Sequence, residues 1–286
     1  IFSLIFILSS ILWLLTYSVF AQTPVSYGQT VSGSIDVAGK IDEFTFAGTN
    51  TDVITLRFAK TSGTFSPYVE LFNPAGTRIT YSSSGIINAT LTSTGTFKIT
   101  LRDYSNTNTG SYDLSLQRVN NPAGATTLNF GQTASGNIDS FTKIVAYSFT
   151  AASNDKVIIA FDSLSQASGY FGPYLELYDS TGTRLVYSSS GLLTATIATA
   201  GNFYLLVTDG NRDGAGTYEL TLQRTNNPAN VKDVNYGVIV DDSLDVVTGI
   251  NVYQFTANTN DIITICSAVK TQTSGYFSCY LELYDS

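Results

Sequence analysis

A near-copy of one stretch recurs along this chain at a domain-sized spacing. Residues 67–85 read PYVELFNPAGTRITYSSSG, residues 173–191 read PYLELYDSTGTRLVYSSSG, and CYLELYDS occupies residues 279–286. Pro67 and Pro173 are 106 residues apart, whereas the units of solenoid proteins span about 20 to 50 residues. The repeat therefore predicts separate modules that each bury a core of their own. We place these modules at residues 27–124, 130–230 and 236–286.

The third module stops before the turn that follows the same strand in the other two. We therefore expect residues 236–286 to lack the later strands of a module and to form only a truncated sandwich. This abrupt end and the missing initiator Met suggest a piece of a longer reading frame.

Hydrophobic residues within a module alternate with a period of two, which is typical of half-buried β-strands. The predicted inward residues of one such strand are Ile54, Leu56 and Phe58 in the first copy and Val157, Ile159 and Phe161 in the second. Turn clusters such as PAGT, SSSG and NTNTG separate similar runs, and no segment shows helical periodicity. The pattern predicts an all-β chain of tandem antiparallel β-sandwich modules, and it leaves jelly-roll and immunoglobulin-like topologies both open.

Composition narrows the range of partners. Hydrophobic residues make up 43% of the chain, enough for packed cores, while charged residues make up only 13%, against about 25% in ordinary soluble domains. The net charge of −8 and the pI of 4.4 exclude a nucleic-acid-binding surface, because such a surface needs clustered Lys and Arg.

The first residues form an uncharged apolar segment that ends in Val19-Phe20-Ala21, a spacing that suits signal peptidase. We interpret residues 1–21 as a secretory signal peptide. An uncleaved membrane anchor is the alternative, because about 18 to 20 apolar residues span a bilayer. Either reading predicts a secreted or cell-surface protein, whose membrane contact is limited to such an anchor.

Two cysteines, Cys266 and Cys279, both lie in the third module. An exported chain meets oxidising conditions, which favour a disulfide between them, and free thiols are the alternative. The chain contains no His, so the pair cannot complete a typical zinc site.

A succession of motifs carries a family resemblance. A strand with alternating aromatic residues (EFTFAG, AYSFTA, VYQFTA) precedes a strand that follows an Asp (DVITLRF, DKVIIAF, DIITICS); YLELYDSTGTR and a closing GSYDLSLQ or GTYELTLQ come later. This succession resembles bacterial pre-peptidase C-terminal domains over both full modules and the visible part of the third. The resemblance implies jelly-roll-like, non-catalytic modules of secreted bacterial proteins, often beside peptidases or other exported enzymes, with some relatives related to collagen-binding modules. It implies no catalytic residues.

The residues themselves also argue against catalysis. Without His, the Ser-His-Asp and Cys-His arrangements are excluded. Glycosidases need two carboxylates within about 10 Å of each other, yet the repeated Glu70, Glu176 and Glu282 occur once per module. We therefore predict no catalytic residues.

The sequence DGNRDG at 209–214 matches the first half of a calcium loop, with Asp209, Asn211 and Asp213 at alternate positions. The twelfth position holds Leu220 in place of a bidentate Glu. A calcium site at Asp209, Asn211 and Asp213 is therefore one hypothesis, and the alternative is an Asp/Asn/Gly-rich hairpin loop without a cation. No other cofactor is predicted.

Aromatic residues alternate with Glu on one repeated strand. On an exposed sheet face they could stack on sugar rings or grip a peptide, because Tyr has an apolar body and a polar tip; the alternative is that neighbouring strands, loops or modules cover them. The candidate ligand-binding residues are Tyr68 and Phe72 in the first module and Tyr174 and Tyr178 in the second.

We therefore interpret the chain as a non-catalytic array for binding, targeting or spacing, with an extracellular polysaccharide or protein as its ligand. Several similar weak sites on one chain would act through avidity. The alternative is an accessory region of a larger secreted peptidase or other hydrolase whose catalytic domain lies outside these residues.

Overall fold

The segments with a two-residue hydrophobic period form β-strands in the computed structural model, which describes residues 22–272 and 278–285. The described residues contain strands, turns and irregular segments but no helix, so none that could cross a bilayer. The predicted all-β class is confirmed. The predicted signal peptide, residues 1–21, lies outside the described residues.

The first nine strands form two facing sheets, which we call module 1. One sheet is five-stranded, in the order β1-β3-β8-β5-β6, and the other is four-stranded, in the order β2-β9-β4-β7. The strands are β1 (Thr23–Pro24), β2 (Gln29–Ile35), β3 (Ile41–Gly48), β4 (Val53–Lys60), β5 (Pro67–Phe72), β6 (Arg78–Ser82), β7 (Ile86–Thr90), β8 (Gly95–Asp103) and β9 (Gly110–Arg118).

The pairing of these strands decides between the two topologies left open by the sequence. Strand β2 pairs with β9, β3 with β8, β4 with β7 and β5 with β6, all antiparallel. This nested pairing is that of one long hairpin wrapped into two sheets, which is a jelly roll. An immunoglobulin-like domain divides its strands differently between the sheets.

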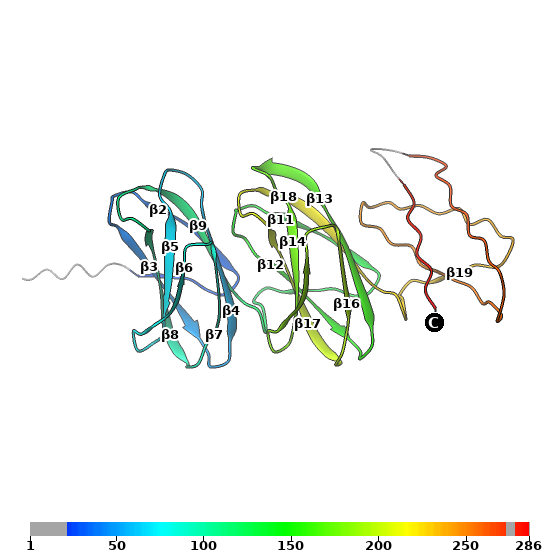
Figure 1. The fold of residues 1–286 in the computed structure, drawn as a ribbon, viewed down its shortest axis with the longest axis horizontal. Helices are drawn as coiled ribbons and strands as arrows, with labels where there is room; N and C mark the ends of the chain where they lie inside the picture. Colours follow the sequence, from blue (N-terminus) through cyan, green and yellow to red (C-terminus); the bar gives the residue numbers. More distant parts are fainter. Residues whose placement is uncertain (1–21, 273–277, 286) are drawn as a thin grey trace, which may run out of the picture.

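The next nine strands repeat this arrangement and form module 2. Its sheets have the orders β10-β12-β17-β14-β15 and β11-β18-β13-β16, so each strand has a counterpart nine strands earlier. The strands are β10 (Thr126–Thr127), β11 (Gln132–Ile138), β12 (Val145–Ala151), β13 (Lys156–Ser168), β14 (Pro173–Asp179), β15 (Arg184–Ser188), β16 (Leu192–Thr196), β17 (Gly201–Asp209) and β18 (Ala215–Arg224). Figure 1 shows the two modules side by side, with their strands running in similar directions.

Each module has its own apolar core between its two sheets. The predicted alternation is confirmed, because all of the inward residues named from the sequence are buried there: Ile54, Leu56, Phe58, Val157, Ile159 and Phe161.

A buried tyrosine lies in each core, Tyr112 on β9 and Tyr218 on β18. Gly33 on β2 and Gly136 on β11 make room for them, since a Cβ would lie 2.4 Å from the Tyr112 hydroxyl and 2.3 Å from Tyr218. The Tyr112 hydroxyl donates a hydrogen bond of 2.5 Å to Asp42. Burial raises the pKa of both phenols far above the ordinary value.

The outer face of the four-stranded sheet of module 1 packs on the outer face of the five-stranded sheet of module 2. Arg57 on β4 donates a hydrogen bond of 2.5 Å to Glu176 on β14, and the two residues are only 2% and 4% exposed. Apolar residues from both modules form a cluster at this junction, composed mainly of Val119, Ile144, Ala146, Tyr178 and Leu206. The modules are thus joined by a close-packed junction as well as by a linker.

Hydroxyl groups extend the junction. Ser115 on β9 lies 2.8 Å from Thr142 of module 2, and Asp113 accepts a hydrogen bond of 3.3 Å from the backbone N–H of Phe141. The counterparts of these groups meet again beyond module 2: Thr221 lies 2.9 Å from Thr248, whose hydroxyl donates a hydrogen bond of 3.0 Å to Glu219.

The residues after module 2 contain little regular structure. Their strands are β19 (Lys232–Asp233) and β20 (Tyr253–Gln254), which pair in parallel. Large apolar residues of this segment, such as Ile239 and Ile262, are exposed. The described residues of this segment therefore do not form a closed sandwich (Figure 1).

Candidate functional site

Two tyrosine pairs occupy equivalent positions on the five-stranded sheets. In module 1, the ring of Tyr68 on β5 lies 5.5 Å from the ring of Tyr81 on β6. In module 2, Tyr174 on β14 lies 5.7 Å from Tyr187 on β15. The outer ring of each pair is open to solvent, since Tyr81 is 56% and Tyr187 57% exposed. Each module therefore presents one accessible aromatic face beside a more buried one.

An arginine and a glutamate hold the outer ring of module 1 in place. The guanidinium carbon of Arg78 lies 5.1 Å from the centre of the Tyr81 ring, and Arg78 donates a hydrogen bond of 2.6 Å to Glu70. This hydrogen bond raises the pKa of Arg78, so the side chain stays cationic. A cation over an aromatic face restricts the ring.

Module 2 repeats this arrangement. The guanidinium carbon of Arg184 lies 4.9 Å from the centre of the Tyr187 ring, and Arg184 donates a hydrogen bond of 2.6 Å to Glu176. We call the two sets of four residues the tyrosine ledges. They consist of Tyr68, Glu70, Arg78 and Tyr81 in module 1, and of Tyr174, Glu176, Arg184 and Tyr187 in module 2.

The candidate ligand-binding residues predicted from the sequence separate into two groups. Tyr68 and Tyr174 belong to the ledges. Phe72 lies at the other end of β5, half-buried with the Lys98 ammonium 5.1 Å from its ring centre. Tyr178 is 7% exposed and packs in the junction between the modules. Strands β5 and β14 thus each place one aromatic residue in a ledge and a second one outside it.

Sequence reasoning missed the exposed half of each ledge. Tyr81 and Tyr187 stand just before the SSSG turns, in RITYS and RLVYS. Their repetition next to Arg78 and Arg184 is the signal that could have identified them, because a strand following a tight turn returns beside the strand before it.

The loop proposed to hold calcium is organised by one carboxylate. Asp209 accepts hydrogen bonds from the backbone N–H groups of Gly172 at 3.0 Å, Asp213 at 2.8 Å and Gly214 at 3.1 Å. The side chains of Asn211 and Asp213 are exposed. In the part of the chain that the structure describes, no three Asp, Glu, His or Cys side chains gather as metal ligands would.

Module 1 builds the same kind of loop without a second acidic residue. Asp103, the counterpart of Asp209, accepts hydrogen bonds from the backbone N–H groups of Ser66 at 2.8 Å, Thr107 at 3.0 Å and Asn108 at 3.1 Å. Burial alone would raise the pKa of Asp103, but these bonds and one from Ser105 lower it well below the ordinary range. In module 1, one carboxylate thus closes the loop through hydrogen bonds to its backbone N–H groups.

Cys266 and Cys279 are both exposed, and the structure has them as free thiols. Both lie in the segment after module 2, in which the described residues form only the short strands β19 and β20. The disulfide between Cys266 and Cys279 stays a prediction.

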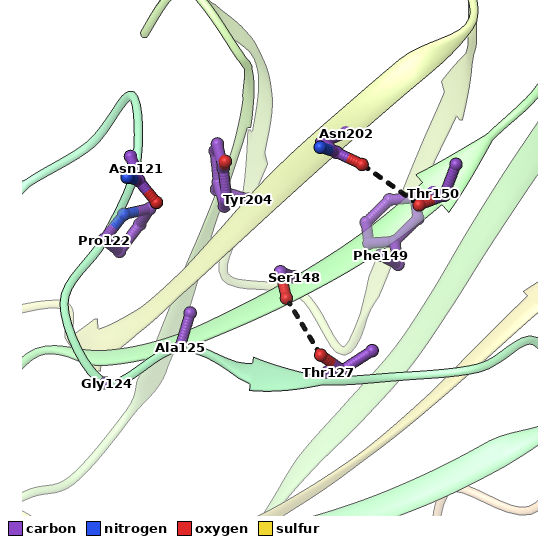
Figure 2. Close-up of a pocket in the computed structure, with 10 residues that line it drawn as sticks. All are labelled: Asn121, Pro122, Gly124, Ala125, Thr127, Ser148, Phe149, Thr150, Asn202 and Tyr204. Atoms are coloured by element: carbon purple, nitrogen blue, oxygen red, sulfur yellow. Dashed lines mark hydrogen bonds between the residues drawn. The ribbon is translucent and has the colours of Figure 1, made fainter.

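A shallow pocket of about 410 Å³ lies where the linker between the modules crosses the five-stranded sheet of module 2 (Figure 2). Its lining is neutral, so it offers no counter-charge to an ionised ligand and no acid–base pair for catalysis. The lining residues are Asn121, Pro122, Gly124, Ala125, Thr127, Ser148, Phe149, Thr150, Asn202 and Tyr204. Hydrogen bonds join Thr127 to Ser148 at 3.5 Å and Thr150 to Asn202 at 3.1 Å.

No protein-family model matches the chain. No curated protein matches it either. Among solved structures, the chain is similar to the pre-peptidase C-terminal domain of collagenase from Bacillus anthracis, with 23% identity and a TM-score of 0.30; the match covers 36% of this chain and 98% of that domain. The family that the sequence motifs resemble is thus also found among the structural neighbours.

Two further neighbours have similar scores. PliG from Salmonella Typhimurium, a periplasmic inhibitor of g-type lysozyme, is 20% identical with a TM-score of 0.28, and the match covers 36% of this chain and all of that one. The CUB1-EGF-CUB2 region of human MASP-1/3 is 10% identical with a TM-score of 0.20, and the match covers 67% and 99% of the two chains.

Proposed function

We propose that this chain is a non-catalytic binding array of a secreted or cell-surface bacterial protein, and that its tyrosine ledges bind an extracellular polysaccharide. The observation that carries the proposal is the repetition of the ledges. Tyr81 and Tyr187 are exposed to the same degree and are braced by equivalent Arg–Glu pairs. A cross-strand aromatic pair contributes to the stability of a sheet, and equal exposure of the outer ring in both modules favours a second role at the surface.

The chemistry of a ledge suits a sugar. A tyrosine ring offers an apolar face to the C–H groups of a pyranose, and its hydroxyl, with the neighbouring guanidinium, can bond the sugar hydroxyl groups. The outer rings of both ledges, Tyr81 and Tyr187, are open to solvent, which suits a long chain that lies along them better than a small ligand that needs enclosure.

Two weak sites on one rigid body gain through avidity. The buried Arg57–Glu176 pair and the apolar junction hold the modules against each other, so the separation of the ledges does not depend on a flexible linker. Once one ledge binds, the second meets the same polymer at a high effective concentration. This arrangement therefore favours a ligand with a repeating structure.

Two features support the absence of catalysis, and a third supports an extracellular location. The chain contains no His, the repeated glutamates act as partners of Arg78 and Arg184, and the apolar segment 1–21 reads as an export signal. The motif resemblance to pre-peptidase C-terminal domains favours a second context, in which the same array serves as the accessory region of a larger secreted peptidase or other hydrolase.

Retention of the full chain on insoluble polysaccharides tests the proposal. We expect binding to at least one polysaccharide, a several-fold weaker retention for Tyr81→Ala or Tyr187→Ala, and a loss greater than either for the double variant. Tyr170→Ala is the matched control, because Tyr170 is 70% exposed in module 2 but lies outside the ledges. A double variant that is retained as well as Tyr170→Ala would exclude the ledges as the binding site.

A further inference from the structure

The ledge of module 1 carries an additional guanidinium. Arg102, at the end of β8, lies with its guanidinium carbon 4.4 Å from the centre of the Tyr68 ring. The ring of Tyr104 lies 5.7 Å from Tyr68 at 66° and is 63% exposed. Tyr68 therefore contacts Tyr81, Tyr104 and Arg102, which together form one surface.

No carboxylate of the described residues neutralises Arg102. Its Nη1 donates hydrogen bonds to the backbone carbonyls of Asp103 at 2.9 Å and Tyr104 at 3.1 Å, and to the side-chain oxygen of Asn106 at 3.2 Å. The carboxylate of Asp103 is buried and faces the N–H groups of its own loop. The guanidinium is thus positioned by neutral acceptors.

The surroundings of Arg102 carry a local positive excess. On the outer face of this sheet, Arg78 pairs with Glu70 and Lys98 pairs with Glu43, at 2.6 Å and 3.0 Å. The opposite charges within each of these two pairs cancel, so the charge of Arg102 is left without a counter-charge. The chain as a whole has a net charge of −8, so this local excess is opposite in sign to the rest of the protein.

Module 2 has none of these additional groups. The counterpart of Arg102 is Thr208, which is buried, and the counterpart of Tyr104 is Gly210. The two ledges therefore share the tyrosine pair and its Arg–Glu brace. Module 1 adds Arg102 and the ring of Tyr104, whereas the further cation of module 2 is the buried Arg57, which pairs with Glu176. Because their exposed side chains differ, we expect the two ledges to recognise different ligands.

We propose that the ledge of module 1 is selective for an acidic polysaccharide, one whose sugar residues carry a carboxylate. The inference rests on the polysaccharide binding proposed above and names the class of polymer. The free N–H groups of Arg102 pair with the uronate carboxylate, because a guanidinium matches that group in charge and shape. The rings of Tyr81 and Tyr104 contact the sugar faces next to it.

Oligomers of galacturonic acid and their fully methyl-esterified forms are the probes, since they share a backbone and differ in charge. Titration calorimetry with the full chain is expected to show about tenfold tighter binding of the acid than of the ester at low salt, a ratio that falls as salt rises. Arg102→Thr, which installs the residue of module 2, is expected to bring the ratio close to one. Arg102→Lys should retain part of it, and Tyr170→Ala should leave it unchanged.

Three outcomes would overturn the inference. One is equal binding of acid and ester by the wild type, and another is an unchanged ratio in an Arg102→Thr variant with wild-type thermal unfolding. The third is equally tight binding of a glutamate oligomer of the same charge, which would point to an acidic protein as the partner. If Tyr81→Ala and Tyr187→Ala still weaken binding of the neutral ester, the proposed function survives while the acidic selectivity fails.

Discussion

The outer faces of the two five-stranded sheets show how one scaffold serves two purposes. Equivalent positions hold Glu43, Lys98 and Thr100 in module 1, but Ala146, Tyr204 and Leu206 in module 2. The face of module 2 is covered by module 1, and its apolar side chains pack in the junction. The face of module 1 carries the ion pair of Lys98 with Glu43, which is partly solvated.

This difference teaches that the outward residues decide what a sheet does, while the inward residues decide that it forms. The inner faces of both modules carry the same alternation of aliphatic and aromatic residues. A partly exposed ion pair contributes little to stability, whereas an apolar side chain or a charge that is removed from water contributes or costs much more. Substitutions at equivalent positions should therefore have unequal effects.

The largest effect is expected at the glutamates. Glu176→Ala leaves Arg57 buried without a partner and should lower the free energy of unfolding by about 3 to 5 kcal/mol. Glu70→Ala, the equivalent change on the open face, should cost less than about 1 kcal/mol. Urea unfolding followed by circular dichroism measures both, and equal losses would mean that coverage by module 1 does not matter.

Arg57→Ala should lower the free energy of unfolding by an amount between those for Glu70→Ala and Glu176→Ala. Glu176 then keeps its hydrogen bond of 2.6 Å to Arg184, so no unpaired charge is left at the junction. Module 2 itself has Ala160 at the counterpart of Arg57. A loss larger than that of Glu176→Ala would show that the arginine contributes through packing more than through its charge.

A smaller effect is expected where the two faces differ in polarity. Leu206 is fully buried in the junction cluster, and Leu206→Thr, which installs the residue of module 1, should cost about 2 to 3 kcal/mol. The reverse change, Thr100→Leu, should alter stability by less than about 1 kcal/mol. The same unfolding experiment applies, and the comparison fails if the two changes are equivalent.

The loop closed by Asp103 should make the free energy of unfolding of module 1 depend on pH in the acid range. The pKa of Asp103 is lowered in the folded chain, so its contribution is complete above the unfolded pKa of about 4 and is lost as the pH falls below it. Asp103→Asn should cost about 1 to 2 kcal/mol at neutral pH and should reduce the loss of stability below about pH 4. Unchanged acid dependence in this variant would place the titrating group elsewhere.

The smallest effect is expected for the calcium hypothesis, which stays a prediction to be tested at Asp209, Asn211 and Asp213. Because Asp209 already accepts three backbone N–H groups, chelator should leave the Tm unchanged. Asp213→Ala should change stability by less than about 0.5 kcal/mol, as at most exposed positions. A Tm that rises with added calcium in the wild type, but not in Asp213→Ala, would establish the site.

Much of the fold could be predicted from alternation and turns. The two-residue period of Ile54, Leu56 and Phe58 depends only on the geometry of an extended chain, and it placed the core correctly. Jelly-roll topology could not be read in the same way, since it depends on which distant strands pair, and alternating patterns are equally compatible with several strand orders.

The candidate site was partly predictable for a similar reason. Tyr68 and Tyr174 were named from their outward position, but the sequence alone assigned the same position to Tyr178, which is buried by a neighbouring module. Whether an outward residue meets solvent or another surface depends on contacts between residues far apart in the chain.

The sequence by itself determined that this protein consists of copied β-modules with apolar cores, because hydrophobic period and turn chemistry are local properties. Only the tertiary structure decided that Arg57 and Glu176 form a buried pair, that Tyr81 joins Tyr68, and that no carboxylate of the described residues pairs with Arg102. Each of these contacts joins residues that are separated in the sequence. The separation is 119 residues for Arg57 and Glu176, 13 for Tyr68 and Tyr81, and 34 for Tyr68 and Arg102. Such contacts arise when sheets are assembled and stacked, and no local pattern encodes them.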